Sequence, residues 1–99
     1  MTPAQHEALA ILAEECGEVM QVIGKMLRHG IVVDHPTMGK WDNTRELMIE
    51  MADAVVAMTL VARELDLSVD QIECNLHTKV EALRKWTHNI DWSKYDDIF

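Results

Sequence analysis

Two segments of this chain place carboxylates where the helical spacing of their neighbours calls for apolar side chains. The first reads Glu14-Glu15-Cys16-Gly17-Glu18 and the second reads Glu50-Met51-Ala52-Asp53. At about 100° of rotation per residue, Glu15 falls on the shoulder of an apolar stripe, and Asp53 is the only charge between Met51 and Ala62. Because an unpaired carboxylate is costly to bury, we expect a cation between two helices that carry these segments.

The composition favours one compact helical domain over residues 1–99. Of these 99 residues 48% are hydrophobic, and only four are glycine and two are proline, which favours an all-α fold. No basic segment precedes an apolar run at the N-terminus, and the apolar stretch 54–62 is far shorter than the roughly 20 residues that span a bilayer. We therefore expect a cytoplasmic protein with no membrane partner.

The net charge and the cysteines further limit the functions and folds that the chain can have. A net charge of −8 argues against nucleic-acid binding, which depends on cationic neutralisation of phosphates, but it does not exclude a phosphate-bearing small substrate. Cys16 and Cys74 both lie within apolar helical patterns, so we predict reduced core residues. Cys16 belongs to the expected centre of the first apolar stripe, which comprises Leu9, Leu12, Cys16, Val19, Ile23 and Leu27.

Capping residues divide the chain into three helices. Thr2-Pro3-Ala4-Gln5 has the form of a capping box with proline at the first helical position, and Gly30 follows the last turn of that helix. Asn43-Thr44-Arg45-Glu46 resembles a second capping box. We expect Glu46 to complete this helix cap rather than to support the acidic residues as a neighbour. Ser68 begins a third capping box, at the start of the third helix. The expected helices are about 3–29, 43–65 and 69–87, with a loop over 30–42 and a tail, 89–99, that forms a turn or short helix docked on a neighbour.

An antiparallel pairing of the first two helices brings the acidic segments together. At 1.5 Å per residue, Glu18 lies about 16 Å before the end of the first helix, and Glu50 and Asp53 lie about 10–15 Å after the start of the second. Glu15 and Glu18 are three residues apart, as are Glu50 and Asp53, so each pair lies on one side of its helix. We therefore predict a site made of these four carboxylates.

Oxygen ligands of this kind suit hard cations, chiefly Mg²⁺, with Mn²⁺ as the usual substitute. Without such ions four close carboxylates could not all stay ionised, because like charges raise one another's pKa. The reaction class that fits is metal-assisted attack of water on a phosphoanhydride. Glu14 adjoins the cluster but points partly away from it. It is either a general base for the water or a surface charge.

These motifs resemble those of the MazG-like, all-α nucleoside triphosphate pyrophosphohydrolases. Glu15-Cys16-Gly17-Glu18 is similar to the family's E-x-G-E, and Glu50-Met51-Ala52-Asp53 to its E-L-A-D or E-L-G-D. The stretch from Ile23 to Glu46, and the third-helix segments His77-Thr78-Lys79 and Leu83-Arg84-Lys85-Trp86, resemble a small phage-borne branch. The likeness covers residues from about 8 to 86.

The resemblance implies hydrolysis of a (deoxy)nucleoside triphosphate to the monophosphate and pyrophosphate, in control of the nucleotide pool. It assigns Mg²⁺ binding to the four predicted ligands and water activation to Glu14. It also implies a homodimer or tetramer that completes a four-helix bundle. The second helix supports this independently, because it is apolar nearly all round. One departure is Leu83, since several relatives have a polar or basic residue four positions after the lysine that matches Lys79.

Other residues admit two interpretations. Lys25 shares a helical side with Glu14 and Glu18, and it either contacts phosphate or pairs with an acid. Trp41 either stacks on a base or anchors the loop. Lys79 and Arg84 are further candidates for phosphate binding. The five histidines show no metal-ligand spacing.

Two other functions stay open. One is a non-catalytic acidic helical dimer that binds a regulatory partner. The other is hydrolysis of an alarmone. The base preference and the choice of dimer or tetramer are not predicted.

Overall fold

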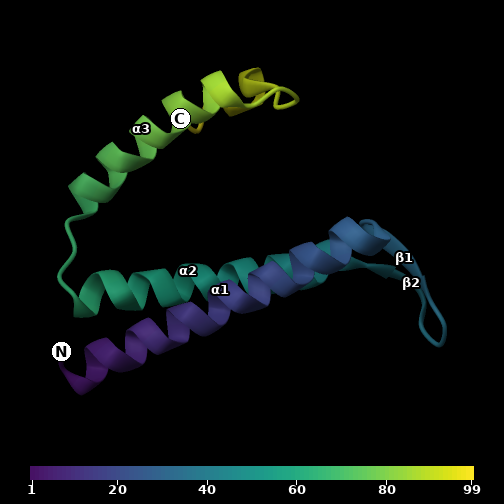
Figure 1. The fold of residues 1–99 in the computed structure, drawn as a ribbon, viewed down its shortest axis with the longest axis horizontal. Helices are drawn as coiled ribbons and strands as arrows, with labels where there is room; N and C mark the ends of the chain where they lie inside the picture. The colour runs from purple at the N-terminus through teal and green to yellow at the C-terminus, as the bar shows by residue number, and fades with distance from the viewer. The chain divides into compact units, whose positions relative to one another are not determined.

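The computed structural model describes residues 1–99 and divides into two compact units, 1–66 and 67–99, which are described separately. The first unit contains four elements and the second contains α3 and a short 3₁₀ helix (Figure 1). The single domain predicted over the whole chain stays a prediction. The elements are α1 (Pro3–His29), β1 (Val32–His35), β2 (Gly39–Asp42), α2 (Asn43–Glu64), α3 (Val69–Trp86) and the 3₁₀ helix η1 (Trp92–Tyr95).

The predicted helices are confirmed to within one residue at each end, and so is the mainly helical fold. The capping box at the start of α1 is present: Thr2 donates its backbone N–H to Gln5 Oε1, and Gln5 donates its own to Thr2 Oγ1. The helix ends at Gly30, whose φ of 95° lies in the region that favours glycine. None of the helices is both long and apolar enough to cross a membrane.

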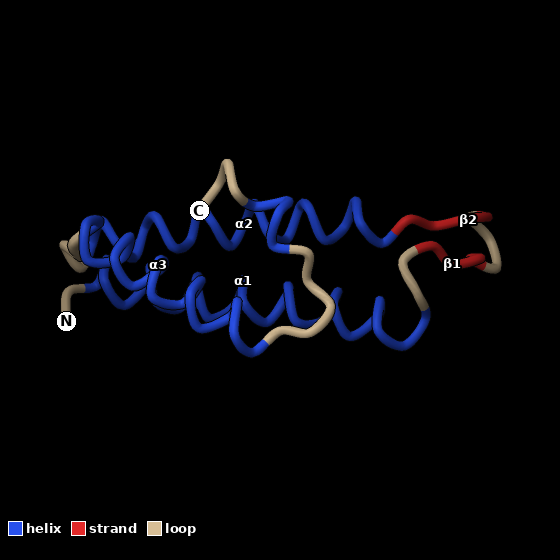
Figure 2. Tube along the Cα trace, turned by 90° about the horizontal axis from the view of Figure 1, so that it is seen from above, coloured by secondary structure: helices blue, strands red, loops and turns tan.

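In the first unit α1 and α2 lie side by side and run in opposite directions, as the antiparallel hairpin requires (Figures 1 and 2). The residues buried in this unit's core are alanines and valines. Ala57 is fully buried, and Val22 is 2% exposed. The remaining buried apolar residues of this unit are Ala8, Ala54 and Val61.

The expected centre of the apolar stripe on α1 is wrong. The helix turns the neighbouring arc toward α2, the one that carries Ala8, Glu15 and Val22, while Ile23 is 42% and Leu27 is 83% exposed. The physical reason is that the apolar arc of α1 is wider than the seam that one partner helix can cover. The predicted core position of the cysteines is also wrong, since Cys16 and Cys74 are both exposed, but both are free thiols as predicted.

The segment expected to be a loop contains a β-hairpin, which extends from the end of the helix pair (Figures 1 and 2). Strands β1 and β2 are antiparallel, with Val33 opposite Trp41 and His35 opposite Gly39. Gly39 has a φ of 72°, which permits the tight turn between the strands. The strands are only four residues long, too short to give a clear alternating pattern.

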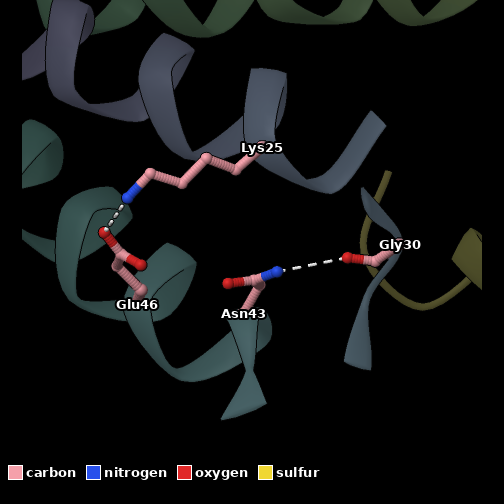
Figure 3. Close-up of polar contacts among 4 residues, drawn as sticks. All are labelled: Lys25, Gly30, Asn43 and Glu46. Carbon is pink, nitrogen blue, oxygen red and sulfur yellow. Dashed lines mark hydrogen bonds and ion pairs between the residues drawn. The ribbon is translucent and has the colours of Figure 1, made fainter. Parts of the chain in front are cut away.

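Asn43, which the sequence pattern predicts as a helix cap, instead joins the hairpin to the helices. Its backbone N–H donates to the carbonyl of Ile31 at 2.9 Å, and its side-chain Nδ2 donates to the carbonyl of Gly30 at 3.1 Å (Figure 3). Asp42 is therefore the N-cap of α2, and it accepts a hydrogen bond from the Thr44 N–H. The predicted capping role of Glu46 is wrong.

In the second unit Ser68 caps α3, as predicted, by accepting a hydrogen bond from the Gln71 N–H. The tail docks on the end of that helix, which confirms its expected behaviour. Trp92 donates its indole N–H to Thr87 Oγ1 at 3.0 Å, and the guanidinium carbon of Arg84 lies 5.2 Å from the centre of the Trp92 ring. Such a cation over an aromatic face is attractive.

Candidate metal centre

Three of the four predicted ligands come together between α1 and α2. Glu15, Glu50 and Asp53 each offer one carboxylate oxygen, and these oxygens all lie within 4.8 Å of one another. Glu15 comes from α1, whereas Glu50 and Asp53 lie one turn apart on α2. The antiparallel pairing predicted from helical rise therefore places both acidic segments at the same height.

Glu18 lies beside this cluster rather than within it. Its carboxylate is not among the three converging groups, yet its charge is close enough to Glu50 to raise the pKa of that residue. Glu18 is half-buried, like Glu15 and Glu50, whereas Glu14 is exposed. The exposed position of Glu14 next to the cluster matches the expectation that it points partly away from the other acids.

The electrostatics of the cluster disfavour its own ionised state. Partial burial raises the pKa of Glu15, and the carboxylates of Asp53 and Glu50 raise it further. Partial burial also raises the pKa of Glu50, followed by the charges of Glu18 and Asp53. A divalent cation would reverse the sign of this local field. The cluster is thus poorly balanced in charge by the chain alone.

The donor set fits a hard divalent cation. All of the converging donors are carboxylate oxygens, the type that Mg²⁺ and Mn²⁺ prefer, and there is no thiolate or imidazole among them. Three such groups leave room for water or substrate oxygens, which Mg²⁺ normally retains. Glu15, Glu50 and Asp53 could therefore hold such an ion directly, with Glu18 at their side.

Of the four predicted substrate-binding residues, Lys25 and Trp41 lie in the same unit as the acids. Lys25 Nζ lies 3.3 Å from Glu46 Oε1, so it pairs with an acid, one of its two expected roles (Figure 3). Trp41 lies on β2 and is 37% exposed. Lys79 and Arg84 belong to the second unit, in which Arg84 stacks on Trp92.

A cleft of about 810 Å³ opens at the hairpin end of the first unit. Lys25 and Trp41 both line it, together with Asn43, His29 and Glu46. The sequence pattern did not indicate His29 or Asn43 as parts of a site. Asn43 is placed in the cleft by its two hydrogen bonds to the segment after α1. These bonds join residues that are distant in the sequence, so no local sequence pattern indicates them.

No protein-family model, curated protein or solved structure matches the chain. The resemblance of Glu14–Glu18 and Glu50–Asp53 to the MazG-like motifs therefore stays a prediction. The function must be inferred from the chain's own residues and their arrangement.

Proposed function

We propose that this chain is a Mg²⁺-dependent, MazG-like pyrophosphohydrolase that converts a (deoxy)nucleoside triphosphate to the monophosphate and pyrophosphate. The observation that carries the proposal is the convergence of Glu15, Glu50 and Asp53 oxygens within 4.8 Å. Each of these charges disfavours ionisation of its neighbours, and a bound divalent cation would offset that repulsion. Their placement on one seam between two helices is the arrangement that a bridging cation stabilises.

The acids would divide between two tasks. Glu15, Glu50 and Asp53 would hold the ion, with Glu18 completing the ligand set directly or through water. When bound, Mg²⁺ supplies positive charge that offsets the triphosphate and the charge developing in the transition state. Mn²⁺ would substitute for it.

Glu14 is the proposed general base. It is exposed next to Glu15, where its carboxylate can accept a proton from an attacking water. The water oxygen forms a bond to one phosphorus of the α–β anhydride as the bridging P–O bond breaks, so pyrophosphate and the monophosphate separate. The proton passes to Glu14 and then to solvent.

A homodimer or tetramer forms part of the proposal. The first unit leaves large apolar side chains exposed on both helices, among them Leu27 at 83% on α1 and Met48 at 62% on α2. Val55 and Val56 are each 60% exposed. Large apolar side chains exposed in this number favour an association face. A second copy that packs its own hairpin there would complete a four-helix bundle.

The test is a panel of ribo- and deoxyribonucleoside triphosphates incubated with Mg²⁺, with chromatography of the products. The expected products are a nucleoside monophosphate and pyrophosphate in equal amounts, with no turnover in excess chelator. Release of orthophosphate alone, or no turnover of any nucleotide, would contradict the proposal. A guanosine tetraphosphate arm tests the alarmone alternative.

Two variants tie the activity to the site. Glu15→Gln should abolish turnover because it removes a ligand of the ion. Glu7→Gln is the matched control, since Glu7 is an exposed acid on the same helix outside the cluster. Equal activity in the two variants would disprove the site assignment.

A further inference from the structure

The cleft at the hairpin end has the dimensions of a ligand site. Its volume of about 810 Å³ falls within the range of small-molecule pockets. α1 contributes Lys25 and His29, the hairpin contributes Trp41, and α2 contributes Asn43 and Glu46. All of them belong to the first unit.

Asn43 supplies the cleft with a fixed hydrogen-bond acceptor. The residue is only 4% exposed, and its Nδ2 is held by the Gly30 carbonyl at 3.1 Å. That bond fixes which end of the amide is oxygen, because a carbonyl can only accept. Figure 3 shows Oδ1 turned to the side of the Lys25–Glu46 pair.

The Asn43 oxygen has no partner within the chain. No hydrogen bond to Oδ1 is formed, yet the atom is not sealed from solvent. An amide that is locked in one orientation, in a residue that lines the cleft and with its oxygen accessible to solvent, offers an acceptor that a ligand donor can reach in exchange for water. The donor that this geometry calls for is an N–H or O–H group of a ligand.

The walls favour a flat, partly apolar ligand over a bare phosphate. Trp41 offers an aromatic surface, and Val32 and Met38 add apolar side chains. Asp34 and Glu46 also line the cleft, and their carboxylates would repel phosphate oxygens but can accept hydrogen bonds from sugar hydroxyls. Stacking on an aromatic ring and donation to a fixed acceptor are the two contacts by which proteins hold a nucleobase.

The cleft lies within reach of the acidic cluster. Glu46 precedes Glu50 by four residues and Lys25 follows Glu18 by seven, distances of about 6 and 10 Å along the helices. Glu46 is also near enough to raise the pKa of Glu50. Lys25, which lines the cleft and follows Glu18 along α1, would carry part of the charge of a triphosphate chain that joins the two regions.

We infer that this cleft binds the nucleoside of the substrate, with its base on Trp41 and an N–H of that base donated to Asn43 Oδ1. This rests on the proposed function for the identity of the substrate, but the cleft can be tested without catalysis. It places base recognition within the helix hairpin, and it assigns Lys25 to the phosphate chain that leads to the acids.

The first experiment measures binding in the absence of metal. The indole N–H signal of Trp41, assigned by its loss in Trp41→Phe, is followed by nuclear magnetic resonance while a nucleoside monophosphate is added in chelator. The Trp41 signal should shift and saturate for at least one base, because Trp41 lines the cleft. For that base, an analogue methylated at its N–H donor should bind several-fold more weakly.

The second experiment measures turnover. Trp41→Ala should raise the KM of the preferred triphosphate about tenfold, because base stacking is lost, while the Mg²⁺-induced rise in Tm is unchanged. Glu7→Gln is the control, since Glu7 is an exposed residue of the same unit that does not line the cleft, and it should leave KM as it is. Turnover with an unchanged KM in Trp41→Ala would overturn the cleft assignment and leave the proposed function standing.

The opposite pattern separates the two ideas. If no triphosphate is hydrolysed but nucleoside monophosphates shift the Trp41 signal, the cleft assignment holds and the proposed function fails. If no nucleotide shifts the Trp41 signal at millimolar concentration, the cleft assignment fails whatever the turnover.

Discussion

Glu15→Gln is expected to make the metal-free protein more stable and to remove its response to Mg²⁺. Partial burial and the charges of Asp53 and Glu50 raise the pKa of Glu15 above its ordinary value of 4.5. A carboxyl whose pKa is raised by folding favours the folded state when protonated and opposes it when ionised. At neutral pH the glutamine side chain of Glu15→Gln therefore removes the destabilisation caused by the ionised carboxylate. It is also uncharged, so it is a poor ligand for Mg²⁺.

The size of the Mg²⁺ response follows from linkage. An ion that binds only the folded state adds RT ln(1 + [L]/Kd), which is about 1.4 kcal/mol at ten times Kd. A small domain changes its Tm by about 4–8 °C per kcal/mol. The wild-type chain should therefore gain about 6–11 °C on addition of Mg²⁺ at ten times its Kd, and Glu15→Gln should gain almost nothing.

The assay is thermal melting followed by far-ultraviolet circular dichroism, at neutral pH with and without Mg²⁺. Glu7→Gln serves as the control, since it removes the same charge from an exposed site on the same helix. It should melt with the wild-type response to Mg²⁺. An equal Mg²⁺ shift in Glu15→Gln and wild type would refute the reasoning, as would a loss of metal-free stability in Glu15→Gln.

Three further predictions test the pH dependence, the packing and the proposed base. Because folding raises the pKa of Glu15 and Glu50, their contribution to stability is fullest below pH 4.5 and is lost as pH rises through their folded pKa values. In metal-free urea titrations the advantage of Glu15→Gln over wild type should thus grow with pH, and a constant difference would contradict this. Ala57→Leu should cost about 1–3 kcal/mol in the same titrations, because Ala57 is fully buried, whereas Val56→Leu, at a 60% exposed position, should cost far less. Glu14→Gln should lower kcat about 10²- to 10⁴-fold with the Mg²⁺ shift in Tm retained; an unchanged kcat would identify Glu14 as a surface charge.

Helix boundaries and the meeting of the acids could be predicted because both follow from local rules. Thr2, Gly30 and Ser68 mark helix ends by their capping chemistry, and a fixed rise per residue sets the height of Glu15 against that of Asp53. Each of these signals depends only on residues within a few positions of it, or on the constant geometry of a helix. They therefore survive without knowledge of the tertiary contacts.

The hairpin and the true packing face could not be predicted, because both depend on contacts between distant segments. The apolar arc of α1 is wide enough for two neighbours, so its spacing alone does not show that Val22 rather than Ile23 meets α2. Asn43 resembles a cap in the sequence, but bonds to Gly30 and Ile31 draw it into the hairpin junction. The cleft, and the acceptor that Asn43 presents to it, follow from that junction.

The central claim is that Glu15, Glu50 and Asp53 together hold a divalent cation. Calorimetric titration of the metal-free chain with Mg²⁺ or Mn²⁺, repeated with Asp53→Asn, tests it most directly. We expect saturable binding to the wild-type chain and much weaker or no binding to the variant. Equal affinity in both proteins, or no binding to the wild-type chain at millimolar metal, would contradict it.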